Sequence, residues 1–193
     1  MKPSNSNGVI LAAMVASLVV LSACSKTDES AGEPSGTRAE HTKTLAESLA
    51  EMPDLSQFGT ALETAQLGSI FDGPGSYTLL APTNAAFTAI ADEATVLMTE
   101  EQRPVLVAVV REHILPGHLT TGNISQAIDS KGGPVTVTTL GGTDVTFSRI
   151  GDVITVDNGA GSTATLAGPE AIASNGTIIP LDAILIPEEQ PDA

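Results

Sequence analysis

Aromatic residues are scarce in this sequence of 193 residues, which has no tryptophan, one tyrosine and four phenylalanines. Proteins that bind single-stranded nucleic acid or carbohydrate commonly stack their ligands on exposed aromatic rings. The composition therefore argues against a binding site built on an aromatic platform.

Basic residues are also few, since eight lysines and arginines stand against 23 aspartates and glutamates, giving a formal net charge of −15. Nucleic-acid binding requires cationic side chains that neutralise phosphates, so nucleic acid is excluded as a partner. The acidic residues are scattered and form no long run, which favours a well-solvated surface. The alternative is a cationic partner, or divalent ions that bridge to an anionic polysaccharide.

Catalytic motifs are missing as well. There is no Gly-x-Ser-x-Gly nucleophile elbow and no phosphate-binding Gly-x-x-x-x-Gly-Lys. His113 and His118 lie five positions apart, but Pro116 and Gly117 break the helix between them, so they make a poor metal site. We therefore expect no enzymatic activity, no cofactor and no metal.

Cysteine occurs once, at Cys24, so the chain can form no internal disulfide and must depend on a packed core. An apolar segment, 9–23, precedes it and follows Lys2, and this segment is too short for a confident transmembrane span. Residues Leu21 to Cys24, Leu-Ser-Ala-Cys, resemble the lipobox of bacterial lipoproteins. The alternative is that Cys24 is a buried free thiol.

The lipobox resemblance implies that residues 1–23 are a signal peptide and that Cys24 carries diacylglycerol as the mature N-terminus. Ser25, where aspartate would suggest retention at the inner membrane, favours the outer membrane. Residues 24–44 are polar and lack aromatics, which predicts a flexible tether with a reach of roughly 25 Å. A folded domain is predicted over 45–188, with a tail over 189–193.

The first half of the domain has helical periodicity. Leu45 with Leu49, and Phe58 with Leu62, recur at intervals of four, and Pro53 separates two short helices. Gly68 is expected near the C-cap of the second helix.

A strand is predicted over 77–81 and ends at Pro82, which has no amide hydrogen to donate. Thr83 or Asn84 is then expected to cap a helix that carries Phe87 and Ile90 on one face.

A later helix reaches His113. Thr99 with Gln102 resembles a capping box for its start, although Pro104 favours a regular start at Arg103 or Pro104.

The second half has strand periodicity. Residues 135–140, 143–150 and 153–156 are separated by two Gly-containing turns, which predicts an antiparallel meander. Val135, Val137, Val145 and Phe147 are expected to face the core, and Thr136, Asp144, Thr146 and Ser148 to face water. The apolar run 176–185 suits an interior strand, with Pro180 at a bulge or an unpaired edge position. Helices followed by strands predict an α+β domain.

Three segments carry a resemblance to the fasciclin domain family. Thr78 to Phe87, TLLAPTNAAF, resembles the first signature box; Glu112 to Gly117, EHILPG, resembles the central box; and Ala173 to Pro187 resembles the closing segment. The resemblance covers 45–187, with Glu112 where the family usually has tyrosine. It implies a wedge-shaped β sandwich with helices packed along one edge, and a non-enzymatic adhesion module.

Asn84 and His113 are the candidate binding residues. Asn84 either caps its helix and ties strand to turn, or serves as an exposed recognition residue. His113 ends a helix, where its ring can bond a late carbonyl, and the family resemblance implies a packing role for the matching histidine. Asn175 and Gly176 are expected to form a turn that requires positive φ.

Together these features predict a protein of the bacterial cell envelope, lipid-anchored to the outer membrane, that mediates adhesion through a protein or polysaccharide partner. The alternative is a periplasm-facing accessory protein that binds a partner protein or a small hydrophobic ligand between the helices and the sandwich.

Overall fold

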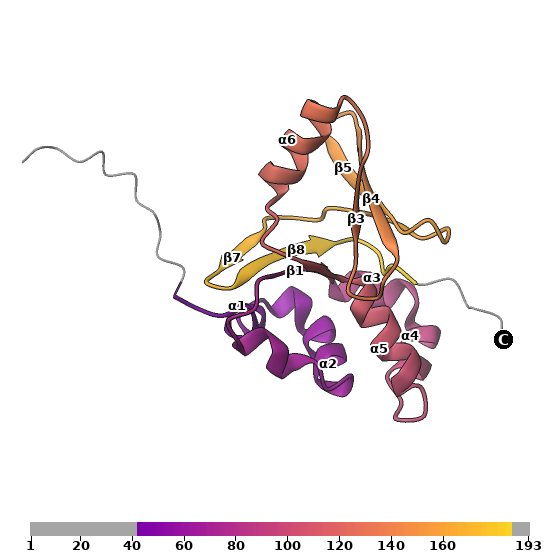
Figure 1. Cartoon of the computed structure of the whole chain (residues 1–193). Coiled ribbons are helices and arrows are strands. Elements are labelled where there is room, and N and C mark those ends of the chain that lie inside the picture. The colour runs from indigo at the N-terminus through magenta and orange to yellow at the C-terminus, as the bar shows by residue number, and fades with distance from the viewer. Residues whose placement is uncertain (1–41, 187–193) are drawn as a thin grey trace, which may run out of the picture. The chain divides into compact units, whose positions relative to one another are not determined.

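The computed structural model describes residues 42–186. The predicted signal peptide 1–23, Cys24, the tether as far as residue 41 and the tail 189–193 lie outside the described residues. The described part is a mixed α+β fold with two four-stranded sheets and helices (Figure 1).

Six α-helices and two 3₁₀ helices occur in the described residues. Their bounds are α1 (Leu45–Ala50), η1 (Pro53–Leu55), α2 (Ser56–Thr64), η2 (Gly68–Asp72), α3 (Asn84–Ala89), α4 (Ala91–Leu97), α5 (Arg103–Glu112) and α6 (Thr121–Lys131). The two short helices predicted on either side of Pro53 are confirmed as α1 and α2, and the predicted apolar residues Leu45, Leu49, Phe58 and Leu62 are buried.

The first sheet has the strand order β2-β1-β8-β7, and β1 and β8 are its interior strands. Its members are β1 (Tyr77–Pro82), β2 (Ile114–Pro116), β7 (Ala171–Ala173) and β8 (Gly176–Leu181). β1 runs parallel to β8 and antiparallel to β2, and β7 runs antiparallel to β8. The predicted interior position of the closing strand is confirmed.

The second sheet is an antiparallel meander with the order β3-β4-β5-β6. Its strands are β3 (Val135–Thr138), β4 (Asp144–Ile150), β5 (Val153–Asp157) and β6 (Thr163–Thr165). The three predicted strands are confirmed as β3, β4 and β5. Facing was predicted for the first two of them, and there Val145 and Phe147 are fully buried, whereas Thr136 and Asp144 are exposed.

Both faces of the first sheet are buried. Side chains alternate between the two faces along each strand, so neighbouring residues of one strand belong to different cores. Leu79 and Ile178 point to one face and join a core with the helices α1 to α5, which we call the helical core. Leu80 and Ile179 point to the other face and meet the second sheet and α6 in the sandwich core. Figure 1 shows the second sheet and helices α1 to α5 on opposite sides of β1 and β8.

Two local predictions need correction. Thr99 and Gln102 form no capping box, because Gln102 makes no side-chain cap bond. Instead, α5 begins at Arg103, which is one of the two starts that the position of Pro104 favoured. Gly68 does not cap α2, since that helix ends before Ala65 and Gly68 begins η2. The positive φ near the end of α2 belongs to Gln66, with φ 60°.

Pro180 does not lie at a strand edge, since it is opposite Ala81 in the ladder between β8 and β1, but it has no partner in the ladder with β7. The ladder between β7 and β8 ends at the pair of Ala171 and Ile178, and the Pro180 carbonyl accepts a hydrogen bond from Ala167 beyond that end. The missing amide of Pro180 therefore interrupts no ladder.

Candidate binding site

His113 is the C-cap of α5 and is 1% exposed. Its Nδ1 lies 2.8 Å from the Val109 carbonyl oxygen, and its Nε2 lies 3.0 Å from the Leu185 amide nitrogen. Because the Leu185 amide can only donate, Nε2 is the acceptor and Nδ1 carries the hydrogen that is donated to Val109. The bond to a late helix carbonyl that the sequence suggested is confirmed.

Burial lowers the pKa of His113 from 6.5 to about 4, although the hydrogen bond to the Val109 carbonyl acts in the opposite direction. A proton on Nε2 would also set an N–H group of the ring against the N–H group of Leu185, and the hydrogen bond between them would be lost. The neutral ring therefore ties the end of α5 to the closing segment, and a partner protein cannot reach it.

Glu112, the neighbour of His113, is a buried carboxylate, 3% exposed. It accepts hydrogen bonds from the hydroxyls of Thr139 and Thr143 at the turn between β3 and β4. A Cβ on Gly141 would overlap this carboxylate, so any other residue there would have to displace the Glu112 side chain. Glu112 thus fixes the second sheet to the end of α5, a role that the sequence pattern did not indicate.

Asn84 lies at the first position of α3 but does not cap it; Thr83 is the N-cap and its hydroxyl accepts from the Ala86 amide. The Asn84 side chain instead binds the turn before α2. Its Oδ1 accepts from the Gln57 amide at 3.0 Å and its Nδ2 donates to the Pro53 carbonyl at 2.9 Å. The side chain is half-buried and joins α3 to η1 and α2.

Asn175 forms a second clamp on the same side of the first sheet. Its Oδ1 accepts from the Leu45 amide at 2.8 Å, and its Nδ2 donates to the carbonyls of Phe71 at 2.7 Å and Gly73 at 2.9 Å. Gly176 is needed for close approach, because a Cβ there would overlap the Tyr77 carbonyl. The sequence indicated a turn here, whereas the side-chain clamp was not predicted.

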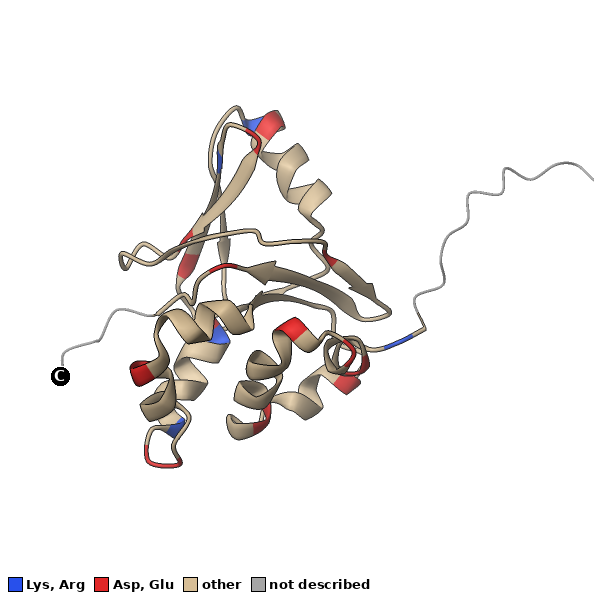
Figure 2. Ribbon diagram, turned by 180° about the vertical axis from the view of Figure 1, so that it is seen from behind, with Lys and Arg blue, Asp and Glu red and all other residues tan. Residues whose placement is uncertain are grey.

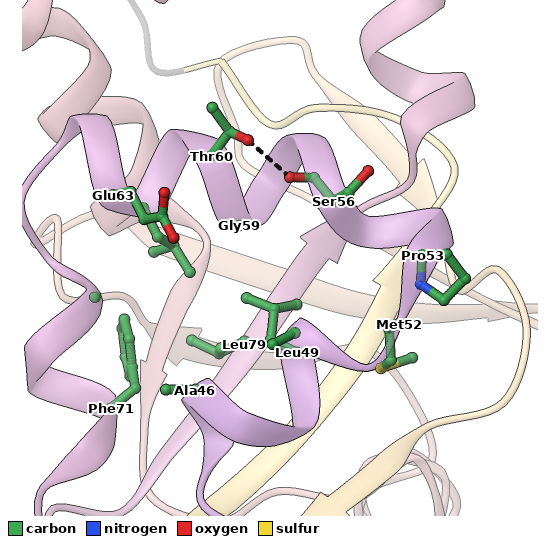
Figure 3. Close-up of a pocket in the computed structure, with 13 residues that line it drawn as sticks. Ala46, Leu49, Met52, Pro53, Ser56, Gly59, Thr60, Glu63, Phe71 and Leu79 are labelled. Carbon is green, nitrogen blue, oxygen red and sulfur yellow. Dashed lines mark hydrogen bonds between the residues drawn. The ribbon is translucent and has the colours of Figure 1, made fainter.

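The two clamps hold the walls of a pocket of about 240 Å³. It lies between α1, η1, α2, η2 and β1, on the helical side of the first sheet, and Figure 3 shows the residues that line it. These residues are Ala46, Leu49, Ala50, Met52, Pro53, Ser56, Gly59, Thr60, Leu62, Glu63, Gly68, Phe71 and Leu79.

Figure 3 shows Glu63 and Phe71 at one end of the pocket and Met52 and Pro53 at the other. Apolar side chains form most of the lining, and Glu63 is its only charged residue. The Thr60 hydroxyl is bonded to the Ser56 carbonyl at 3.0 Å. The pocket is therefore an apolar slot with a carboxylate at one end.

Within residues 42–186, no group of three or more His, Cys, Asp or Glu side chains is placed to hold a metal ion. None of the helices described is long and apolar enough to cross a membrane. Acidic residues are spread over helices and loops rather than gathered in one patch (Figure 2). Cys24 lies outside the described residues.

Comparison with known proteins gives consistent matches. The family model described as "Fasciclin domain" matches residues 53–187. Stabilin-1 from Homo sapiens is 33% identical over 155 residues, which cover 80% of this chain and 6% of stabilin-1. Protein sll1483 from Synechocystis sp. is 27% identical over 163 residues, which cover 84% of this chain and 83% of that protein.

One solved structure, titled as a FAS1 domain pair from the insect cell adhesion molecule Fasciclin I, aligns with a TM-score of 0.66 at 12% identity. The alignment covers 75% of this chain and 51% of that one. This likeness confirms the two-sheet fold with its helices. The chain thus spans a small part of stabilin-1 and about half of the solved domain pair, but most of the length of the Synechocystis protein.

Proposed function

The chain belongs to the fasciclin domain family, and from that premise we propose that it is an adhesion module held on the bacterial cell envelope by a lipid at Cys24. Fasciclin domains are adhesion and binding modules and are generally not catalytic. The observation that carries the proposal is the family match over residues 53–187, which covers nearly all of the described fold.

The lipid anchor is a separate part of the proposal, because Cys24 lies outside the described residues. Its support is the Leu-Ser-Ala-Cys sequence that ends at Cys24, after an apolar segment and before a polar one. A diacylated cysteine with a further acyl chain would supply more than the two signals that stable membrane attachment requires. The folded domain would then sit at the outer membrane on a polar tether.

Partner recognition is assigned to the exterior of the domain. His113 is buried, and both the oxygen and the nitrogen of the Asn84 side-chain amide are bonded to the backbone of η1 and α2. A protein or polysaccharide partner would therefore contact exposed surface positions rather than these two side chains. The acidic surface favours a partner with cationic groups, or a polysaccharide bridged by divalent ions.

A second candidate function is a periplasm-facing accessory protein that binds a small hydrophobic ligand. The pocket between α1, α2 and η2 is the observation that favours it.

Protease treatment of intact cells separates the two candidates. Digestion of the domain while a periplasmic control protein survives would support adhesion, and full protection of the domain would overturn it in favour of the periplasm-facing function. Replacing Cys24 by Ser tests the anchor in the same strain. We expect Cys24→Ser to leave the membrane fraction, whereas an unchanged distribution would refute lipidation at this residue.

A further inference from the structure

We propose that the pocket between α1, α2 and η2 binds a small single-chain amphiphile whose ammonium group pairs with Glu63. The inference rests on the second candidate function, because it specifies the small ligand of the same pocket. This pocket is separate from the exterior positions to which partner recognition is assigned. It can therefore be tested on purified protein, independently of where the domain lies in the envelope.

The size and lining of the pocket favour one short apolar chain. Leu49, Phe71 and Leu79 line it and are at most 6% exposed. Its volume of about 240 Å³ exceeds the roughly 150 Å³ of an apolar cavity that accepts benzene. It is below the roughly 300 Å³ at which pockets for drug-sized ligands begin. Met52 at one end adds a flexible side chain that can adjust to the end of a chain.

Gly59 keeps the slot open from the side of α2. A glycine inside a helix lowers helix stability relative to alanine. Packing does not require it here, because a Cβ on Gly59 would meet only the Leu49 side chain, at an ordinary contact distance of 4.0 Å. Ala46 and Ala50 on α1 are also small and line the slot. Larger side chains at these positions would fill the volume that the proposed ligand occupies.

The charge at the end of the slot selects the ligand's head group. Glu63 is the only charged lining residue, and its side chain is exposed to solvent at the mouth. The three ion pairs found within residues 42–186 do not include it. A cationic head group would meet this carboxylate without displacing a lysine or arginine, whereas a fatty acid would place a second carboxylate beside it. The net charge of −15 also raises the local concentration of cations.

Three probes of equal chain length test this selection: octylammonium, octanol and octanoate. Calorimetric titration gives the affinity of the purified protein for each probe. We expect octylammonium to bind about threefold to fivefold more tightly than octanol, as an exposed ion pair permits, and octanoate to bind more weakly than both. Octylammonium should also raise the melting temperature, because a ligand of the native state stabilises it.

Two substitutions test the contributions of the apolar slot and of the Glu63 charge to binding separately. Gly59→Leu should reduce the affinity for all three probes by about tenfold or more, because a side chain then occupies the slot. Glu63→Gln should lower the affinity for octylammonium to about that for octanol, and it should leave the affinity for octanol unchanged. Glu101→Gln, on the loop between α4 and α5, is the control for the loss of one negative charge, and should keep the preference for octylammonium.

The proposal is overturned if none of the probes binds, if octanoate binds as well as octylammonium, or if Gly59→Leu binds all three unchanged. Circular dichroism shows whether Gly59→Leu is folded. If Gly59→Leu is not folded, Ala46→Leu fills the slot from α1 instead. Wild-type affinity of Ala46→Leu for the three probes would equally refute the site.

Discussion

The two faces of the first sheet bury comparable apolar side chains but are covered by different kinds of layer. On the sandwich side, Leu80 and Ile179 pack against another sheet, whose backbone groups are paired in its own ladders. On the helical side, Leu79 and Ile178 pack against short helices and the turns between them. Helix ends leave amides and carbonyls without partners, so this side needs polar side chains that satisfy them.

The clamps of the helical side meet that need. Asn84 and Asn175 each bind backbone groups from two elements, and His113 joins Val109 of α5 to Leu185 of the closing segment. The pocket lies on the same side, between the helices that the two asparagines hold. We infer that the sandwich side supplies stability through apolar packing, while the helical side holds an adaptable layer in place through a few specific hydrogen bonds.

Removing a large side chain from the sandwich core should have the largest effect. Phe147 is fully buried between the sheets, so Phe147→Ala should lower the free energy of unfolding by about 3–5 kcal/mol. Phe87→Ala, in the short outer helix α3, should fall at the lower end of that range. Urea unfolding measures both changes, and an unchanged midpoint for Phe147→Ala would contradict the packing described for the sandwich core.

Removing a clamp should have the next largest effect, and it should depend on burial. Asn175→Ala leaves the Leu45 amide and two carbonyls without their partner, which should cost about 2–4 kcal/mol. Asn84→Ala should cost about 1–2 kcal/mol, because its partners Pro53 and Gln57 are exposed and water can replace the lost bonds. The comparison of clamps would fail if Asn84→Ala were the more damaging of the two in the same urea experiment.

Acidification should lower the free energy of unfolding through protonation of His113, which lies on the helical side. Its pKa is lowered from 6.5 to about 4 on folding, so the unfolded chain binds the proton first as the pH falls. The contribution of the neutral ring is complete above the unfolded pKa and is lost as the pH falls from 6.5 towards 4. Between about pH 7 and about pH 5 the loss should be about 2 kcal/mol.

The matched variant for this pH dependence is His113→Gln, which has no ionising group in that range. It should be less stable than the wild type at neutral pH but should lose less stability on acidification. Parallel pH profiles for the two proteins, measured by urea unfolding, would rule out His113 as the source of the dependence.

The smallest expected effect is a gain. Gly59→Ala should raise the free energy of unfolding by about 0.5–1 kcal/mol, since alanine is the better helix former and the added Cβ has room. Gly141→Ala is the contrasting control, because its Cβ would overlap the Glu112 carboxylate and should destabilise the protein. A loss of stability in Gly59→Ala would show that the slot is narrower than described.

The sequence was sufficient where local patterns determine structure. Alternation in residues 135–156 predicted three strands and the inward side of the first two, and Pro53 separated two short helices as predicted. Pro82 marked the end of β1 to within one residue, because it is itself the last residue of the strand and pairs with Leu181. By contrast, α6 was missed because Ile124 and Ile128 are its only buried residues, and β6 and β7 because they have three residues each.

The site was harder to predict than the fold. Asn175 binds backbone groups more than 100 positions away, and such distant pairs leave no local pattern. Its Asn-Gly sequence instead indicated only a turn. The pocket depends on the small residues Ala46 and Gly59. The sequence alone does not show that a small residue inside a helix lines a pocket, because that depends on which elements pack around it.

Hydrogen exchange of the purified protein, with and without octylammonium, tests most directly whether the two sides differ in this way. The account predicts slow exchange in β4 and β5 that octylammonium leaves unchanged, and faster exchange in α1 and α2 that octylammonium slows. Equal protection of the two regions, with no change in α1 and α2 on adding octylammonium, would contradict it.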